Sequence, residues 1–575
     1  MATDTRWRAV AALTLGFLAP SGAAPETMPV DAFLTADVGP LQPVGMAAFG
    51  PPAGALSPRA TMAGRLELVV DAKLAHLAVV HDPWGRVAEV GEPIGVLPAV
   101  AIDIVQRGVD LLPLERSLIR GAHPYWEIAF QPGRAWREEA DGGWTRAALP
   151  FVLQERSANC THNGVLAWLF DAAGRVSRAR YQVASETCGY FKADLYGSTG
   201  LVYAARDLAS AAAPAIARLE RHRRARLPVR PLAELADEYP GVDPAGFAVD
   251  DGIDLRDVSV LGLVAGGVHY RSDCRTRHGP FPFCDSLPLP SYSTAKSVFA
   301  GVATMRLQRL HPGFAEQRIA GLLERCDRRR WGDVSIENAL DMATGNFRSP
   351  AFEEDEFSQP HEWFVFADAH RDKLSFACHF FPRKAAPGTR FVYHTSDTYV
   401  LGSALAAFVA RRADGADLYR DVLLEPLWRP LELSPLLDEP LRTYDAVRQP
   451  FTGYGLTYEA DDIVRLAAWL MDGAELDGTP MLDEQMLAAA LQRDPADRGL
   501  PAGAPGLRYN NGFWGFDAGP SLGCARPVWV PFMSGVSGIT VAMFPNGVIY
   551  YYFSDSYVFR WQSAREAAHR IAPLC

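Results

Sequence analysis

The stretch that decides the fold is PSYSTAKSVF, at residues 290–299 of a 575-residue chain. Apolar residues follow it with the spacing of a helix rather than a strand, at Val298, Phe299, Val302, Met305 and Leu307. Ser293 and Lys296 stand three residues apart at the start of this predicted helix. Their side chains therefore share one helix face, with Cβ atoms about 5–6 Å apart.

This spacing suits nucleophilic catalysis. A serine is a poor nucleophile until a base takes its proton, and a partly desolvated lysine can be that base. A helix N-terminus adds a positive field that favours oxyanion chemistry. The same pattern also occurs in capped structural helices. The chain has few lysines, namely Lys73, Lys192, Lys296, Lys373 and Lys384, which argues against an accidental match, but the motif alone leaves both interpretations open.

A second motif, PGTRFVYHTSDTYVLG, occupies residues 387–402. With the S-x-x-K pattern it resembles the serine β-lactamase and penicillin-binding-protein superfamily. The resemblance is greatest to the class C β-lactamase branch, with its carboxylesterases, D-aminopeptidases and aminohexanoate-oligomer hydrolases. It covers roughly residues 240–575 and implies that Tyr393 is the catalytic tyrosine. Thr395 falls on a position that is usually asparagine or serine.

The resemblance implies a mechanism and an oxyanion hole. Ser293 would attack an ester or amide carbonyl, and Lys296 and Tyr393 would shuttle its proton. Which of the two is the base stays open. A cation beside Tyr393 is expected to ease ionisation of the phenol. The backbone N–H groups of Ser293 and Val536 would form the oxyanion hole.

A third motif departs from the family. The residues aligned with its K-T-G or H-T-G are Met533-Ser534-Gly535. Ser534 and Gly535 have small side chains, so the strand that carries them can lie close to the substrate. These two residues and Thr395 are therefore expected to bind the substrate. Methionine cannot pair with a substrate carboxylate, which favours an ester or an amide without one. A β-lactamase or D-amino-acid peptidase stays an alternative, because Arg508 or Arg526 could supply the charge.

The order of predicted elements gives the fold class, α/β (α+β). Strand patterns at 258–264 and 268–270 flank AGG, and those at 540–543 and 548–553 flank PNG; both are hairpin signals. Helical patterning lies between the hairpins, and a closing helix is predicted at 557–571. We therefore expect an antiparallel sheet flanked by helices, preceded by a separate β-rich domain.

The sequence is predicted to divide into four segments. Residues 1–24 have the order of a signal peptide: basic residues, an apolar run, then small residues. Residues 25–207 form a β-rich domain of unknown role. The Ala- and Arg-rich segment 208–231 is interpreted as a helical linker rather than a basic patch. Residues 232–575 form the hydrolase-like domain.

Compartment and partners follow from the composition. Eight cysteines in a chain predicted to be exported suggest disulfides, and nearest-neighbour pairing gives 160–188, 274–284, 326–378 and 524–575. We expect a periplasmic or secreted protein without stable membrane insertion.

A net charge of −11 argues against nucleic-acid binding. No metal or organic cofactor is expected. Expected partners are a small ester or amide substrate and an envelope component contacted by the N-terminal domain.

Two other hypotheses remain. A non-catalytic envelope-binding module with the same fold would explain both the Met533 departure and the extra domain. Gly519–Gly523 also fits the G-x-S-x-G nucleophile elbow, but Pro527 and Pro531 exclude a long helix after Ser521, so this segment is predicted to be a loop. Asn159 formally begins a glycosylation motif, to which we give little weight.

Overall fold

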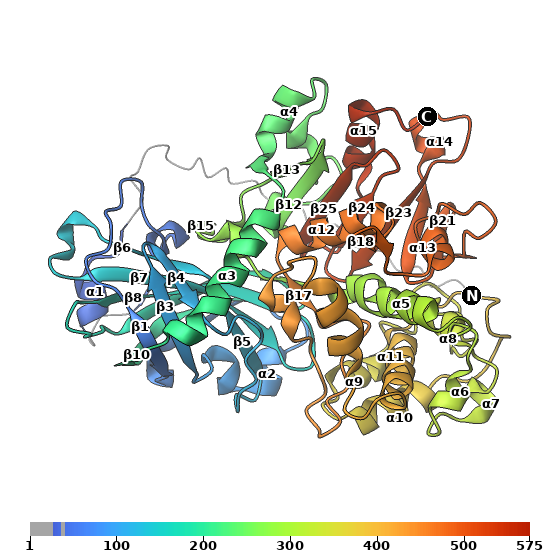
Figure 1. Cartoon of the computed structure of the whole chain (residues 1–575), viewed down its shortest axis with the longest axis horizontal. Coiled ribbons are helices and arrows are strands. Elements are labelled where there is room, and N and C mark those ends of the chain that lie inside the picture. Colours follow the sequence, from blue (N-terminus) through green and yellow to red (C-terminus); the bar gives the residue numbers. More distant parts are fainter. Residues whose placement is uncertain (1–26, 36–40) are drawn as a thin grey trace, which may run out of the picture.

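The structure is a computed structural model that describes residues 27–35 and 41–575. The expected signal peptide, 1–24, lies outside these residues. Figure 1 shows two β-sheets side by side, with helix α3 running between them and a helical region below the second sheet. No helix in the described part of the chain is long and apolar enough to cross a membrane.

The first sheet closes into a barrel. Its strands are β1 (Ala63–Val69), β2 (Ala75–His81), β3 (Ala101–Arg107), β4 (Asp110–Pro113), β5 (Trp126–Phe130), β6 (Gly133–Trp136), β7 (Thr145–Glu155), β8 (Thr161–Phe170), β9 (Ala179–Thr187) and β10 (Lys192–Ala205). The order is β1-β3-β4-β6-β7-β8-β9-β10, and β10 also pairs with β1. The β-rich character was expected, whereas the closure and several strands were not. The long strand β10 makes closure possible, because different parts of it pair with β9, β2 and β1.

Helix α3 (Ala209–Ala225) lies in the segment that follows the first sheet and contacts residues on both sides of it. Arg223 pairs with Asp110 of the barrel at 3.1 Å, and His222 lies 3.1 Å from Glu459 on the other side. Burial opposes ionisation of Glu459, but Arg226 and His222 outweigh it and lower the pKa of this carboxyl to about 2. Arg223 and Arg226 of this segment therefore pair with carboxylates of the protein itself.

The second sheet has nine strands: β11 (Val229–Pro231), β12 (Val258–Ala265), β13 (Val268–Arg271), β20 (Leu500–Pro501), β21 (Leu507–Asn510), β22 (Phe513–Asp517), β23 (Trp529–Gly535), β24 (Ile539–Met543) and β25 (Ile549–Ser554). Their order is β11-β13-β12-β25-β24-β23-β22-β21-β20, antiparallel except for β11 with β13. Both predicted hairpins are present. The expected antiparallel sheet flanked by helices is confirmed.

Helices cover both faces of this sheet. Helix α15 (Gln562–Ile571), which begins five residues later than predicted, packs on one face with α4 (Leu235–Glu238). The other face carries α5 (Val302–Leu310), α12 (Ala460–Met471) and α13 (Glu484–Ala490). Beyond them lie α6 (Ile319–Leu322), α7 (Arg328–Trp331), α8 (Ile336–Leu340), α9 (Gln359–Phe366), α10 (His370–His379) and α11 (Thr395–Ala410).

The segment that carries Ser293 is not the regular helix we predicted. A 3-10 turn, η9 (Tyr292–Thr294), is followed by a π-helical stretch, η10 (Lys296–Gly301), and only then by α5. Tyr292 has a left-handed backbone, with φ of 40°. The Ser297 hydroxyl donates to the Gly512 carbonyl at 2.6 Å. Contacts to a distant turn thus shape this segment, and apolar spacing cannot reveal them.

All four predicted disulfides are present: Cys160–Cys188, Cys274–Cys284, Cys326–Cys378 and Cys524–Cys575.

Candidate active site

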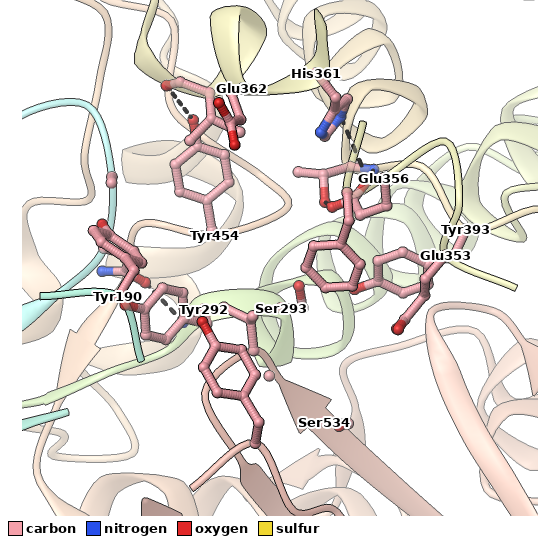
Figure 2. Close-up of a pocket in the computed structure, with 18 of the residues that line it drawn as sticks. Tyr190, Tyr292, Ser293, Glu353, Glu356, His361, Glu362, Tyr393, Tyr454 and Ser534 are labelled. Atoms are coloured by element: carbon pink, nitrogen blue, oxygen red, sulfur yellow. Dashed lines mark hydrogen bonds and ion pairs between the residues drawn. The ribbon is translucent and has the colours of Figure 1, made fainter. Parts of the chain in front are cut away.

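A cavity of about 300 Å³ opens over Ser293. Figure 2 shows Ser293 and Tyr393 facing the same space, with Glu353 beside Tyr393 and with Tyr190 and Tyr454 on another side. The lining comes from the barrel loops, the segment before and within α9, and the end of β23. The site is therefore assembled from both sheets.

Ser293 and Lys296 meet as their spacing predicted. The Lys296 ammonium donates to Ser293 Oγ at 2.9 Å, to Thr395 Oγ1 at 2.9 Å and to the Gly453 carbonyl at 3.3 Å. Thr395 lies in the first turn of α11, and its hydroxyl donates in turn to Glu356. All three donor positions of the lysine are occupied, so the amine is fixed beside the serine.

The environment of Lys296 favours the neutral amine. Its side chain is buried, and burial lowers the pKa to about 8, although Glu356 and Glu353 act in the opposite direction. A substantial neutral fraction is therefore available near pH 8. Neutral lysine can accept a proton from the hydroxyl 2.9 Å away.

Tyr393 also lies at the site, but its predicted ionisation is wrong. The Lys296 ammonium is 4.7 Å from the centroid of the Tyr393 ring. Burial nevertheless raises the pKa of the phenol well above its usual value, and Glu356 raises it further. Tyr393 is thus held as a neutral phenol, because desolvation and the nearby Glu356 carboxylate outweigh the hydrogen bond with Ser293, which lowers the pKa.

The third motif approaches the serine closely. A Cβ on Gly535 would lie 3.0 Å from the Ser291 carbonyl oxygen, so a larger residue here would have to push the Ser291 backbone away by a few tenths of an ångström. Ser534, Gly535 and Val536 line the cavity, and Val536 directly follows β23. Met533 is fully buried and does not line it.

Three residues of the α9 region were missed by the sequence analysis. Glu356 accepts a hydrogen bond from the Thr395 backbone N–H at 2.7 Å, and His361 Nε2 lies 3.4 Å from Glu356. Glu353 lines the cavity as well, and burial together with Glu356 raises its pKa to about 7. The acidic run 353–356 was a possible signal, but nothing in the sequence places it near Ser293.

The barrel contributes to the site, which was also not predicted. Asn159, in the loop between β7 and β8, is buried, and its side-chain oxygen accepts from the Tyr292 N–H at 2.7 Å. The same oxygen accepts from Ser291 Oγ and from the Gly455 N–H, both at 3.0 Å. Its amide nitrogen, the atom that would carry a glycan, is buried and donates to the Leu456 carbonyl at 3.2 Å, so it is not available as a glycan acceptor. Trp84 and Tyr190 line the cavity and stack on each other, with ring centroids 4.6 Å apart.

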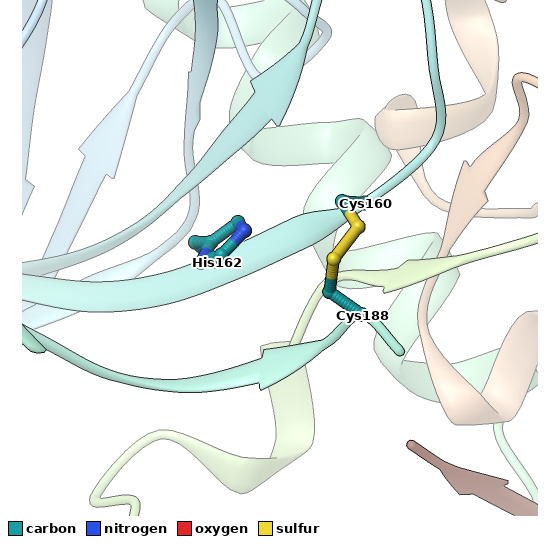
Figure 3. A group of neighbouring side chains, drawn as sticks. All are labelled: Cys160, His162 and Cys188. Carbon is teal, nitrogen blue, oxygen red and sulfur yellow. A yellow bond between two sulfur atoms is a disulfide. The ribbon is translucent and has the colours of Figure 1, made fainter. Parts of the chain in front are cut away.

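Two groups of potential metal ligands occur among the described residues. Cys160, His162 and Cys188 form the first, but Figure 3 shows that their sulfur atoms share a disulfide bond and are not thiolates. The second consists of His222, Asp461 and Asp462; His222 faces Glu459, and Asp462 accepts from the Ser434 N–H at 2.7 Å. The two sulfur atoms, His222 and Asp462 thus have partners within the protein, whereas His162 Nε2 and Asp461 Oδ1 are buried without a hydrogen-bond partner among the described residues.

The competing motif lies outside the cavity. Ser521 belongs to a single helical turn, α14 (Gly519–Leu522), rather than to the predicted loop, and its hydroxyl donates to the Ala518 carbonyl at 2.9 Å. Neither Arg508 nor Arg526 lines the cavity.

Comparison with known proteins gives partial similarities. The chain matches no protein-family model and no curated protein sequence. Its structural neighbours are proteins of the serine β-lactamase and penicillin-binding-protein fold.

Three of these neighbours illustrate the similarity. A penicillin-binding-protein homologue from Caulobacter crescentus has 18% identity, covers 59% of this chain and 95% of its own, and gives a TM-score of 0.40. The hydrolase EstCE1, with promiscuous acyltransferase activity, has 16% identity, 63% and 100% coverage and a TM-score of 0.42. A class C β-lactamase has 13% identity, 59% and 95% coverage and a TM-score of 0.41. This chain is thus similar to hydrolases of that fold at low identity and over part of its length.

Proposed function

We propose that the protein is an exported, periplasmic or secreted serine hydrolase that cleaves an ester or amide through a Ser293 acyl-enzyme. The observation that carries this proposal is the buried Lys296 amine, 2.9 Å from the Ser293 hydroxyl in an open cavity. Four disulfides support export, because such bonds persist in oxidising compartments.

Each group has a role. Neutral Lys296 takes the Ser293 proton as the hydroxyl oxygen attacks the carbonyl carbon. The oxyanion is stabilised by the backbone N–H groups of Ser293 and Val536. The neutral Tyr393 phenol, with Lys296, returns a proton to the leaving group, and water then hydrolyses the acyl-enzyme. Thr395 and Glu356 hold the lysine in position. Ser534 and Gly535 bind the substrate.

The substrate is proposed to lack a carboxylate at the third motif. Met533 is buried, and none of the described residues lining the cavity is lysine or arginine. A β-lactam or D-Ala-D-Ala peptide carries such a carboxylate and would have no counter-charge there. This favours an esterase or amidase over a β-lactamase or D-amino-acid peptidase.

Turnover of a neutral ester tests the function. With p-nitrophenyl butyrate, we expect release of nitrophenol and an intact mass increased by one butyryl group after rapid acid quenching. A folded protein that neither turns over nor becomes acylated across an ester and amide panel would instead favour a non-catalytic binding module. The contact of the barrel with an envelope component stays a prediction.

The rate of acylation should depend on pH through Lys296. Since the pKa of this lysine is about 8 and the neutral form is reactive, the rate is expected to rise about tenfold per pH unit below pH 8 and to level off above it. Stopped-flow measurement of acylation from pH 5.5 to 9.5 checks this. A rate that continues to rise up to about pH 10, near the usual pKa of lysine and tyrosine, would contradict the role of a Lys296 with a lowered pKa.

Asn159 is proposed as a positioning residue. Asn159→Ala removes the acceptor of three donors around Ser293, so kcat is expected to fall about 10–100-fold, with KM changed little. Asn159→Asp keeps an acceptor at the same place and should recover part of kcat. Equal losses in both variants, or a change confined to KM, would contradict a positioning role.

A further inference from the structure

Acidic side chains dominate the charge of the cavity over Ser293. Glu353, Glu356 and Glu362 line it, whereas none of the described lining residues is lysine or arginine. Lys296 lies beside the cavity and, with His361, faces Glu356. Glu356 therefore has Lys296 as a positive partner and His361, whose pKa is lowered by burial, beside it. Glu353 and Glu362 carry no ion pair with any described residue.

Glu353 is the acid best placed to meet a substrate. Its side chain is partly buried, and its carboxylate makes no hydrogen bond with any described residue, although it lies in the cavity of Ser293. Burial and the nearby Glu356 raise its pKa to about 7. A cation bound next to it would stabilise its charged form, because opposite charges at close range favour ionisation. The free protein offers Glu353 no such partner except Lys296.

The walls of the cavity are largely aromatic. Ten aromatic residues line it: Trp84, Tyr190, Tyr292, Phe357, Phe366, Tyr393, Tyr454, Trp514, Tyr557 and Phe559. Aromatic faces attract organic cations, and rings arranged around such a group form a recurring recognition site for ammonium ligands. Two of these rings, Trp84 and Tyr190, come from the barrel and stack at an interplanar angle of 6°.

We propose that the cavity selects esters or amides that carry a compact organic ammonium group near the scissile carbonyl. Glu353 supplies the counter-charge, and the aromatic walls, including Trp84 and Tyr190 of the barrel, surround the cation. This inference rests on the proposed hydrolase function and gives the N-terminal domain a part in substrate selection.

A neighbouring cavity offers the opposite charge. It shares Glu353, Trp514, Ser534 and Phe559 with the first cavity and is also lined by Arg560 and Arg565. Arg565 lies over the rings of Phe516 and Trp561. A substrate that extends in this direction could carry an anion, so an anionic ester belongs in the test.

The test compares esters of equal shape and different charge. One pair places the charge in the leaving group, with butyrylthiocholine against its neutral 3,3-dimethylbutyl isostere. A second pair places it in the acyl group, with the 4-(trimethylammonio)butyrate p-nitrophenyl ester against the 5,5-dimethylhexanoate ester. We expect kcat/KM to be about tenfold higher for the cation in at least one pair. Equal rates in both pairs, or faster turnover of a succinate monoester, would overturn the inference.

Variants locate the effect. Glu353→Gln should reduce the preference for the cation, which is the ratio of kcat/KM for the cationic ester to kcat/KM for its neutral isostere, to about threefold or less. Both esters are measured with each variant at the same pH, because Glu353 also raises the pKa of Lys296. Glu354→Gln is the matched control, because Glu354 lies next in the loop, accepts from Ser349 Oγ at 2.5 Å and does not line the cavity. Trp84→Leu should also lower the ratio of kcat/KM for the cationic ester to kcat/KM for its neutral isostere. A preference lost equally in Glu353→Gln and Glu354→Gln would mean a general charge effect and would overturn the role of Glu353.

The outcomes separate this inference from the proposed function. Turnover of neutral esters without any preference for the cation leaves the hydrolase in place and refutes the substrate class. Absence of turnover and of acylation with every ester refutes the hydrolase. Protection of Ser293 from a fluorophosphonate probe by tetramethylammonium ion gives a second measure that needs no turnover. Failure of protection at concentrations that saturate exposed aromatic sites would also contradict the inference.

Discussion

Ser293→Ala is expected to lower kcat/KM for a neutral ester at least about 10⁴-fold and to abolish labelling by a fluorophosphonate. The reason is that the Ser293 hydroxyl is the only nucleophile proposed to form the acyl-enzyme, so the variant cannot form this intermediate. Residual turnover would come from binding and the oxyanion hole alone. Because Ser293 is a small side chain within a tight turn, its replacement by alanine should leave the fold intact, which circular dichroism checks.

Ser521→Ala is the matched control for this result. Ser521 is the serine of the G-x-S-x-G motif at Gly519–Gly523, and its hydroxyl donates to the Ala518 carbonyl of its own helical turn, outside the cavity. This variant should keep wild-type labelling and turnover. If labelling is lost with Ser521→Ala and kept with Ser293→Ala, the site has been assigned to the wrong serine.

Lys296→Met is expected to cause the second largest loss, about 10³-fold in the rate of acylation. Methionine approximates the length of the lysine side chain but cannot take the Ser293 proton. Lys296→Arg should not restore the rate, because arginine stays protonated at every working pH. Lys73→Met, at an exposed lysine of the barrel, should have no effect. Acylation is measured by stopped flow with p-nitrophenyl butyrate.

The same variants decide which group is the base. If Tyr393 were the base, Tyr393→Phe would cost more than Lys296→Met, and the Lys296→Met variant would recover rate at high pH as the phenol ionised. The buried, neutral state of Tyr393 argues for the opposite order. We therefore expect a loss of about 10²-fold for Tyr393→Phe, as for removal of one proton donor.

Local patterns predicted the parts of the site that lie within continuous motifs. The S-x-x-K spacing placed Ser293 beside Lys296, and the second motif added Tyr393 and Thr395. Two hairpin turns, AGG and PNG, predicted strands of one antiparallel sheet, because their residues favour the required backbone conformations. In each case the information lies within a few neighbouring residues.

The remaining parts depend on contacts between distant segments. Glu353, Glu356 and His361 reach Ser293 only because of how the chain folds between α8 and α11, and Asn159 reaches it from another sheet. The barrel closes through pairing of β1 with β10, more than a hundred residues apart. The ionisation of Tyr393 was predicted in the wrong direction because its sequence neighbours do not reveal how deeply the ring is buried.

Peptide mapping of the trapped intermediate tests the central claim most directly. The wild-type protein is mixed with p-nitrophenyl butyrate, quenched in acid within the burst, digested and analysed by tandem mass spectrometry. We expect one butyryl group per chain, on Ser293 within the peptide that contains residues 290–296. A butyryl group on Ser521 or on any other residue, or no adduct during confirmed turnover, would contradict the account.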